Sequence, residues 1–253
     1  MISSIAFGLF GLAVLISVAL AFSHQRKSVD WKQILAGVGL QVVFAVVVII
    51  VPGGREFFDA ISRVFVKIVD FALIGGQFIF GDLSNADEFG FIFAFQVLPT
   101  IIFFASLMGV LYHIGLMQKI VQGMAWVMLK VLRVSGSESL SVAANVFIGQ
   151  TEAPLVVRPY IAKMTESELF TMMVGGMATI AGAVLAAYIA MLGGTDEAAR
   201  LFYARHLLAA SVMAAPATIV ISKLLRPETE ESLTKGTVHL EIEKTAKIGR
   251  AHV

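Results

Sequence analysis

The fold of this chain is decided by the ten residues Asn145-Val146-Phe147-Ile148-Gly149-Gln150-Thr151-Glu152-Ala153-Pro154. Apolar residues lie on both sides of this polar stretch, but neither apolar arm approaches the roughly 20 residues that cross a bilayer. A short apolar helix that stops at a polar turn indicates a re-entrant hairpin, because irregular backbone at membrane depth survives only where protein or water covers it. Thr151 is expected to cap the second arm with its hydroxyl. Pro154 fits the first turn of that arm, where its missing N–H costs no helical bond.

The composition places the chain in a membrane. Hydrophobic residues make up 58% of the sequence and charged residues 15%, whereas soluble domains carry about 25% charge. The net charge of +1 gives no reason to expect a nucleic-acid partner, and with no cysteine there is neither a disulfide nor a thiolate metal site. The five histidines are scattered without metal-ligand spacing. The first apolar run is too long for the apolar part of a signal peptide.

Uncharged segments predict the first spanning helices. Ile2–Phe22 has 21 residues without a charge and is followed by a basic cluster from His24 to Lys32, which marks the cytoplasmic side. Ile34–Val51 returns outward, and Phe89–Tyr112 returns inward. Between them, Arg55–Phe80 alternates charged and apolar residues at helical spacing, which predicts an amphipathic helix on the outer surface. Glycines 75, 76 and 81 are expected to break the chain there.

The second half of the chain continues this pattern. Gln118–Arg133 predicts an amphipathic helix on the inner surface, and a fourth span is the alternative. The hairpin, at about 137–162, then has its base on the cytoplasmic side. Leu169–Thr195 has 27 residues without a charge and several glycines, so it can cross the membrane and still unwind in the middle. Leu207–Ser222 is expected to return inward.

Shorter signals mark the ends of these last two spans. Thr165 and Glu168 have the spacing of a capping box that starts the helix before the uncharged segment. Pro216 is expected to kink the final span, which ends at the inside charges Lys223 and Arg226.

Two side chains of the central stretch carry the strongest functional signal. Glu152 is the only charge between Ser139 and Val157, and a carboxylate at membrane depth is costly unless it has a role; the alternative is a solvated residue at a loop tip. Asn145 is a poor helix former, and its side-chain oxygen is a hard ligand that suits sodium. The alternative for Asn145 is a hydrogen bond to a neighbouring helix.

The stretch from Gly149 to Leu155, preceded by Asn145-Val146-Phe147, resembles the first hairpin of the concentrative nucleoside transporter family. The resemblance implies that Gln150 and Thr151 contact the base of a nucleoside and that Glu152 binds its ribose hydroxyls. Capping alone is an alternative role for Thr151. Val184 would line the substrate pocket, with plain packing as the alternative.

The resemblance also implies a sodium site. Its ligands would be the Asn145 side chain, the Ile148 carbonyl, the Thr179 hydroxyl and the Ile180 carbonyl. Thr179 stands where the family is expected to have serine, and the hydroxyl is retained. No organic cofactor is implied.

We therefore predict an all-α membrane transporter with a re-entrant helical hairpin and a broken transmembrane helix, a truncated form of an inverted-repeat architecture. Residues 1–112 would form a scaffold part and residues 113–226 a transport part. Residues 227–253 are interpreted as a polar tail, whose last seven residues can be read from a common sequencing adapter.

The predicted function is sodium-coupled nucleoside symport across the inner membrane, by a homotrimer in contact with lipid, and not an enzymatic activity. Proton coupling is one alternative, and a non-transporting assembly subunit is another. The chain is expected to be incomplete, so that alone it neither binds nucleoside tightly nor transports it.

Overall fold

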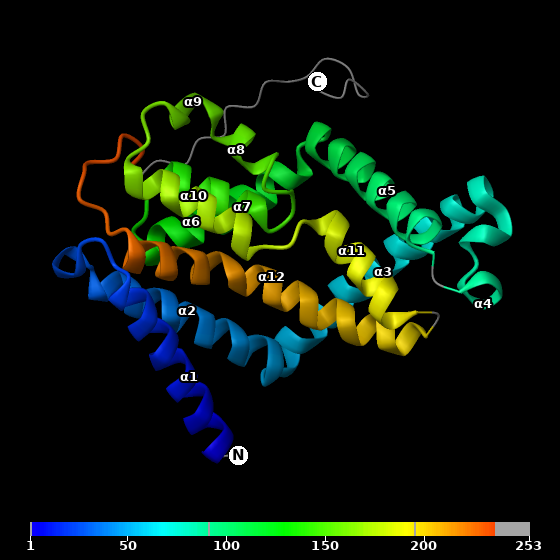
Figure 1. The fold of residues 1–253 in the computed structure, drawn as a ribbon, viewed down its shortest axis with the longest axis horizontal. Coiled ribbons are helices and arrows are strands. Elements are labelled where there is room, and N and C mark those ends of the chain that lie inside the picture. The colour runs from blue at the N-terminus through cyan, green and yellow to red at the C-terminus, as the bar shows by residue number, and fades with distance from the viewer. Residues whose placement is uncertain (1, 91, 195, 236–253) are drawn as a thin grey trace.

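The computed structural model describes residues 2–90, 92–194 and 196–235, and every regular element within them is a helix (Figure 1). The longer helices are α1 (Ile2–Ala21), α2 (Trp31–Ile49), α3 (Pro52–Phe80), α5 (Phe93–His113), α6 (Leu116–Leu132), α7 (Gly136–Asn145), α10 (Glu166–Ala178), α11 (Gly182–Gly193) and α12 (Glu197–Leu225). The shorter ones are η1 (Arg26–Ser28), η2 (Gly81–Ser84), α4 (Ala86–Phe89), α8 (Ala153–Val156) and α9 (Arg158–Ile161). The predicted all-α class is confirmed.

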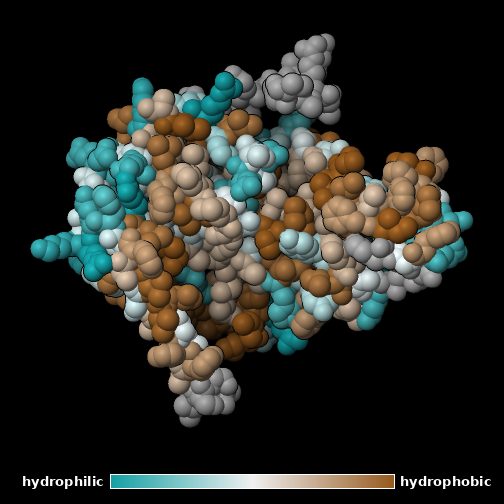
Figure 2. All heavy atoms as spheres, viewed as in Figure 1, coloured by the Kyte–Doolittle hydropathy of each residue, from teal (hydrophilic) through white to brown (hydrophobic). Residues whose placement is uncertain are grey.

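The helices expose an apolar surface of the kind that faces lipid. Five segments are long and apolar enough to cross a membrane, namely Trp31–Ile49, Pro52–Ser84, Phe93–His113, Glu166–Gly193 and Glu197–Leu225. Ala6–Ala21 is a shorter apolar helix. Figure 2 shows hydrophobic residues over much of the visible face, while hydrophilic residues gather at its left edge, where the turn before α2 and the segment after α12 lie. The chain is a multi-pass membrane protein.

The helix α3 differs from its predicted form at its start and in its interior. It begins at Pro52, runs through Gly75 and Gly76 without a break, and ends before Gly81, whose φ is +58°. Gly76 is buried, and a methyl group placed on it would lie 3.5 Å from Cβ of Pro99 in α5. The expected break at Gly75-Gly76 is therefore wrong, since the small residue serves the packing of α5. The placement of α3 on the outer surface stays a prediction.

The last long helix starts earlier than the predicted Leu207. Its first turns contain two arginines, and both are paired with α3. Arg200 forms an ion pair with Asp70, and Nη1 of Arg205 lies 3.0 Å from Oδ1 of Asp59. Because these charges are neutralised, the helix can extend through them.

The core sits around α12, which packs against α2, α3, α10 and α11 and crosses the centre of the molecule in Figure 1. Its main cluster joins α6, α7 and α12. Every residue of α7 is buried. The first arm of the hairpin is thus enclosed by protein, which is the condition that such a segment needs at membrane depth.

The beginning of the predicted polar tail packs against the body of the protein. Ser232 Oγ donates to Oε1 of Glu168 at 2.5 Å, and the hydroxyl oxygens of Thr234 and Ser137 lie 2.9 Å apart. Ser135 and Lys235 form an isolated β-bridge. The remainder of the tail, residues 236–253, lies outside the described residues.

Candidate functional site

The first arm of the hairpin carries Asn145 at its last helical residue. The arm begins with a capping box, in which Oγ of Ser135 accepts from the amide of Glu138 at 3.3 Å and Oε2 of Glu138 accepts from the Ser135 amide at 3.2 Å. Small residues then let α7 sit deep among its neighbours, and the helix ends where the polar stretch begins. The sequence thus delivers an amide side chain at the end of a buried ten-residue helix.

The tip of the hairpin is a tight turn with exposed polar side chains. The amides of Glu152 and Ala153 both donate to the Gly149 carbonyl, at 3.1 and 3.0 Å. Gln150, Thr151 and Glu152 are exposed. Pro154 lies in the first turn of α8, as predicted.

The expected capping role of Thr151 is wrong. The N-cap of α8 is Glu152, and no side chain caps that helix. The Thr151 hydroxyl instead donates to Oε2 of Glu152 at 2.8 Å. The hydroxyl therefore orients the carboxylate, whose second oxygen is left for another donor.

The uncharged segment after the capping box is broken, as predicted. The capping box of Thr165 and Glu168 is present. The first half, α10, ends at Ala178, and Thr179 is extended with φ −109° and ψ 158°. Helix resumes as α11 at Gly182. Thr179 Oγ1 donates to the Gly175 carbonyl at 2.8 Å, which leaves the lone pairs of the hydroxyl for a further partner.

The tip and the break lie against each other. The Gly182 amide donates to the Phe147 carbonyl at 3.0 Å. A methyl group placed on Gly182 would come within 2.9 Å of that carbonyl, and one placed on Gly176 would come within 2.9 Å of Cβ of Gln150. These glycines allow two backbones to approach closely, and so they bring two distant polar segments into one site.

Asn145 lies at this junction. Its side chain is 1% exposed, and neither its oxygen nor its nitrogen has a partner among the described residues. Its Nδ2 points toward Gly175, where a methyl group would lie 3.2 Å away. An unpaired buried polar group costs about 1–3 kcal/mol. Asn145 is therefore placed to bind something other than the surrounding protein.

The other predicted ligands belong to the same two segments. Ile148 lies in the tip, and Thr179 and Ile180 lie in the break; all three are half-buried. In the described part of the chain, neither the Ile148 nor the Ile180 carbonyl accepts a hydrogen bond. Val184 is half-buried in the first turn of α11. Their roles stay predictions.

The base of the hairpin holds a buried ionic cluster that the sequence did not reveal. Lys223 was interpreted as a charge at the cytoplasmic surface, but its side chain is 3% exposed and its Nζ lies 2.5 Å from Oε1 of Glu138. It also donates to Oγ of Ser167 at 2.8 Å. The spacing of Ser135 and Glu138, which is that of a capping box, was the signal that could have located Glu138. Nothing in the sequence pairs it with Lys223.

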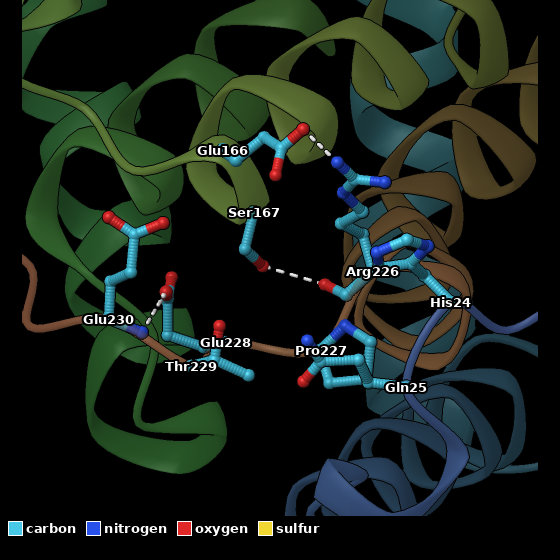
Figure 3. Close-up of a pocket in the computed structure, with 9 residues that line it drawn as sticks. All are labelled: His24, Gln25, Glu166, Ser167, Arg226, Pro227, Glu228, Thr229 and Glu230. Atoms are coloured by element: carbon cyan, nitrogen blue, oxygen red, sulfur yellow. Dashed lines mark hydrogen bonds and ion pairs between the residues drawn. The ribbon is translucent and has the colours of Figure 1, made fainter.

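Two cavities of the described structure lie away from the tip. Beside the base, a small polar cavity of about 50 Å³ is lined by His24, Glu166, Arg226 and their neighbours (Figure 3). There Glu166 pairs with Arg226, and the Ser167 hydroxyl donates to the Arg226 carbonyl at 2.7 Å. A larger groove of about 700 Å³ runs between α2 and α12. Neither cavity includes a predicted ligand residue.

Comparison with known proteins identifies relatives along most of the chain. Residues 10–83 match the family described as "Na+ dependent nucleoside transporter N-terminus", and residues 94–195 match the family described as "Nucleoside recognition". An uncharacterized transporter of Haemophilus influenzae is 41% identical over 246 residues, which are 97% of this chain and 57% of that protein. Sodium/nucleoside cotransporter 1 of Homo sapiens is 42% identical over 222 residues, which are 88% of this chain and 32% of that protein.

Solved structures of the transporter CNTnw have the same fold. Its inward-facing substrate-bound state gives a TM-score of 0.83 at 43% identity, covering 90% of this chain and 54% of that one. A substituted variant in an outward-facing state gives 0.85 at 40% identity, covering 96% and 58%. The chain thus spans about half of the length of CNTnw.

Proposed function

We propose, from the premise that this chain belongs to the concentrative nucleoside transporter family, that it forms part of a sodium-coupled nucleoside symporter of the inner membrane. The family consists of transporters, so the prediction that the chain is not an enzyme is confirmed. One observation carries the proposal: Asn145 is buried where the hairpin tip meets the broken helix, and no residue of the part that the structure describes bonds to its side chain.

The sodium ion would be held across this junction as a co-transported substrate. Asn145 and the Ile148 carbonyl would bind it from the tip, and the Thr179 hydroxyl and the Ile180 carbonyl from the break. None of these four ligands is a carboxylate. A neutral oxygen set suits a monovalent ion better than Mg²⁺ or Ca²⁺, whose sites draw on carboxylates.

The nucleoside would bind on the exposed side of the same tip. The free oxygen of Glu152 would accept from ribose hydroxyls, and Gln150 and Thr151 would contact the base, with Val184 lining the pocket. The hydrogen bond from Thr151 holds the carboxylate in one orientation, which favours binding because less freedom is lost with the ligand.

Coupling between sodium binding and nucleoside binding would follow from the backbone that the two sites share. An ion held by both the tip and the break would fix the turn that carries Gln150 and Glu152. The nucleoside would then bind to a tip that is already ordered. Since such coupling is reciprocal, bound nucleoside would in turn raise the affinity for sodium.

Transport of the bound nucleoside would need one part of the protein to move relative to another. Residues 1–112 would act as a scaffold and residues 113–226 as a moving part, in a homotrimer surrounded by lipid. Transporters of this kind place the site between two repeats, and the opposite wall would come from the length by which the relatives exceed this chain.

Sodium binding can be tested on the 253-residue chain itself, since all four proposed ligands lie within it. We expect sodium chloride to raise the midpoint of thermal unfolding of the purified protein, relative to choline chloride at the same concentration. Asn145→Ala should abolish this increase and change the midpoint in choline little, because the amide has no partner to lose among the described residues.

Transport is tested with a full-length chain, made by joining residues 1–235 to the part of the Haemophilus influenzae relative that follows its matched region. Labelled uridine uptake into vesicles should require a sodium gradient and fall sharply in Asn145→Ala. Equal uptake with sodium and choline at fixed pH, accelerated by a pH gradient, would establish proton coupling instead. No uptake, together with no sodium effect on unfolding, would favour the assembly subunit.

A further inference from the structure

A second buried polar side chain, that of Thr218, flanks the same glycine as Asn145. Thr218 belongs to α12 and is 1% exposed, and its Oγ1 has no hydrogen-bond partner among residues 2–90, 92–194 and 196–235. Both side chains flank Gly175 of α10: a methyl group placed there would lie 3.2 Å from Nδ2 of Asn145 and 3.6 Å from Cγ2 of Thr218. Three helices therefore meet at this point, and two of them each bring a polar group that pairs with no described residue.

The surroundings of Thr218 make its hydroxyl unusual. Ala215 and Ile219, on the same part of α12, are buried in the main apolar cluster. A valine would fill the same space without an unpaired hydroxyl, whose burial costs about 1–3 kcal/mol. A threonine at this position is thus expected to have a polar partner that is not a described protein group.

The neighbouring hydroxyls on the same face of α12 are all satisfied. Oγ of Ser211 donates to the Val146 carbonyl at 3.3 Å, and Oγ of Ser222 accepts from the Thr171 hydroxyl at 3.0 Å and donates to the Ile219 carbonyl at 3.1 Å. Residues 211, 218 and 222 recur at helical spacing and face α7 and α10. Unlike Ser211 and Ser222, Thr218 has no hydrogen-bond partner for its hydroxyl among the described residues, and its Cγ2 methyl group packs next to Gly175.

We propose that Thr218 is a further residue of the cation site, where its hydroxyl supplies an oxygen from α12. This inference rests on the proposed sodium site. The four predicted ligands come from the tip and the break alone, and hard cations such as Mg²⁺ and Ca²⁺ collect about six oxygens or more. Thr218 contacts Gly175, one helical turn before Thr179, through its methyl group, and its hydroxyl would turn toward the ion from there.

The added ligand extends the site to a third helix. Since α12 packs against α2 and α3 as well as α10, an ion bound by Thr218 would connect the hairpin to the helices of the predicted scaffold. Binding of the ion would then also affect helices outside the tip that holds the nucleoside.

The test compares three substitutions in the purified chain. For each, we measure the sodium concentration that produces half of the maximal rise in the thermal unfolding midpoint. Thr218→Val removes only the hydroxyl and should raise this concentration about tenfold. Thr218→Ser keeps the hydroxyl and should stay within about twofold of the unsubstituted protein. Ser222→Ala, on the same face but one turn closer to the base, should leave the concentration unchanged.

A structural role for Thr218 predicts different results. If the Thr218 hydroxyl only stabilises the fold, Thr218→Val should lower the unfolding midpoint measured in choline. It should then leave unchanged both the sodium concentration that gives half of the maximal rise and the ratio of the responses to sodium and lithium. An unchanged sodium dependence in Thr218→Val, in a protein whose unsubstituted form responds to sodium, would overturn this inference alone. No response in the unsubstituted protein would overturn the proposed sodium site. If Thr218→Val does not fold, Thr218→Ala is measured against Thr218→Ser in the same way.

Discussion

The base and the tip of the hairpin differ in whether their polar side chains are paired within the protein. At the base, Glu138 and Lys223 are buried and paired, and Glu168 accepts at both of its oxygens. At the tip, the side chain of Asn145 is equally buried and has no partner among the described residues, while Glu152 is exposed. The polar groups of the base are thus paired within the protein, whereas the tip presents polar groups that the described residues leave available.

This contrast separates stability from binding. Substitutions at the base should cost stability because they leave a charge buried and unpaired. Substitutions of polar groups at the tip should cost binding and leave the unfolding free energy nearly unchanged.

The largest effect is expected from Lys223→Met. This change leaves Glu138 buried without its cation, which costs about 3–5 kcal/mol and should lower the thermal midpoint by roughly 10 °C. Adding Glu138→Gln should recover much of the loss, because the unpaired charge is removed. Lys163→Met, at an exposed position of the hairpin base, should change stability by less than about 0.5 kcal/mol. Equal midpoints for the two lysine variants would show that the buried pair does not stabilise the base.

An intermediate effect is expected from Gly182→Ala, which adds a methyl group 2.9 Å from the Phe147 carbonyl. The tip or the break must shift, at a cost of about 1–3 kcal/mol. The matched control is Gly123→Ala in α6, where nothing lies within 4 Å of the added group. It should be neutral or stabilise by up to about 1 kcal/mol. Denaturation of both variants measures the difference, and a harmless Gly182→Ala would mean that the two segments do not touch as described.

The smallest effect on stability is expected from Glu152→Gln. The side chain is exposed, so the unfolding free energy should change by less than about 0.5 kcal/mol. Nucleoside binding by the full-length chain should nevertheless weaken about tenfold, which is roughly 1.4 kcal/mol. A nucleoside without ribose hydroxyls should lose less affinity than uridine. Equal losses for both ligands would contradict a contact between Glu152 and the ribose.

Much of the fold was predictable because it depends on local signals. Uncharged length predicted four of the five segments that are long and apolar enough to cross a membrane; the fifth, Pro52–Ser84, carries charges and was predicted as a surface helix. The spacing of Thr165 and Glu168 predicted a helix start, and the glycines before Thr179 predicted the break. Contacts between distant residues were not predictable. The burial of Lys223 depends on Glu138 of another helix, and the early start of α12 depends on Asp59 and Asp70 of α3.

The candidate site shows the same division. The sequence located Asn145 and the polar tip, since each stands out from an apolar context. Thr218 does not stand out in this way, because a threonine in an apolar helix commonly bonds to its own backbone. Only the packing of α12 against Gly175 shows that Thr218 and Asn145 flank the same glycine, and that neither side chain has a hydrogen-bond partner among the described residues.

The two capping boxes have an electrostatic consequence. They start α7 and α10 at the same end of the hairpin, and the two helices have 10 and 13 residues, so both end close to Asn145 and Thr179. Each helix carries a partial charge of about −0.5 at its carboxyl end, and the two ends converge there. A positive ion is therefore favoured by the direction of two backbones. Unlike a carboxylate, this source of negative potential does not titrate and cannot rotate away, so the preference for a cation should persist as the pH falls.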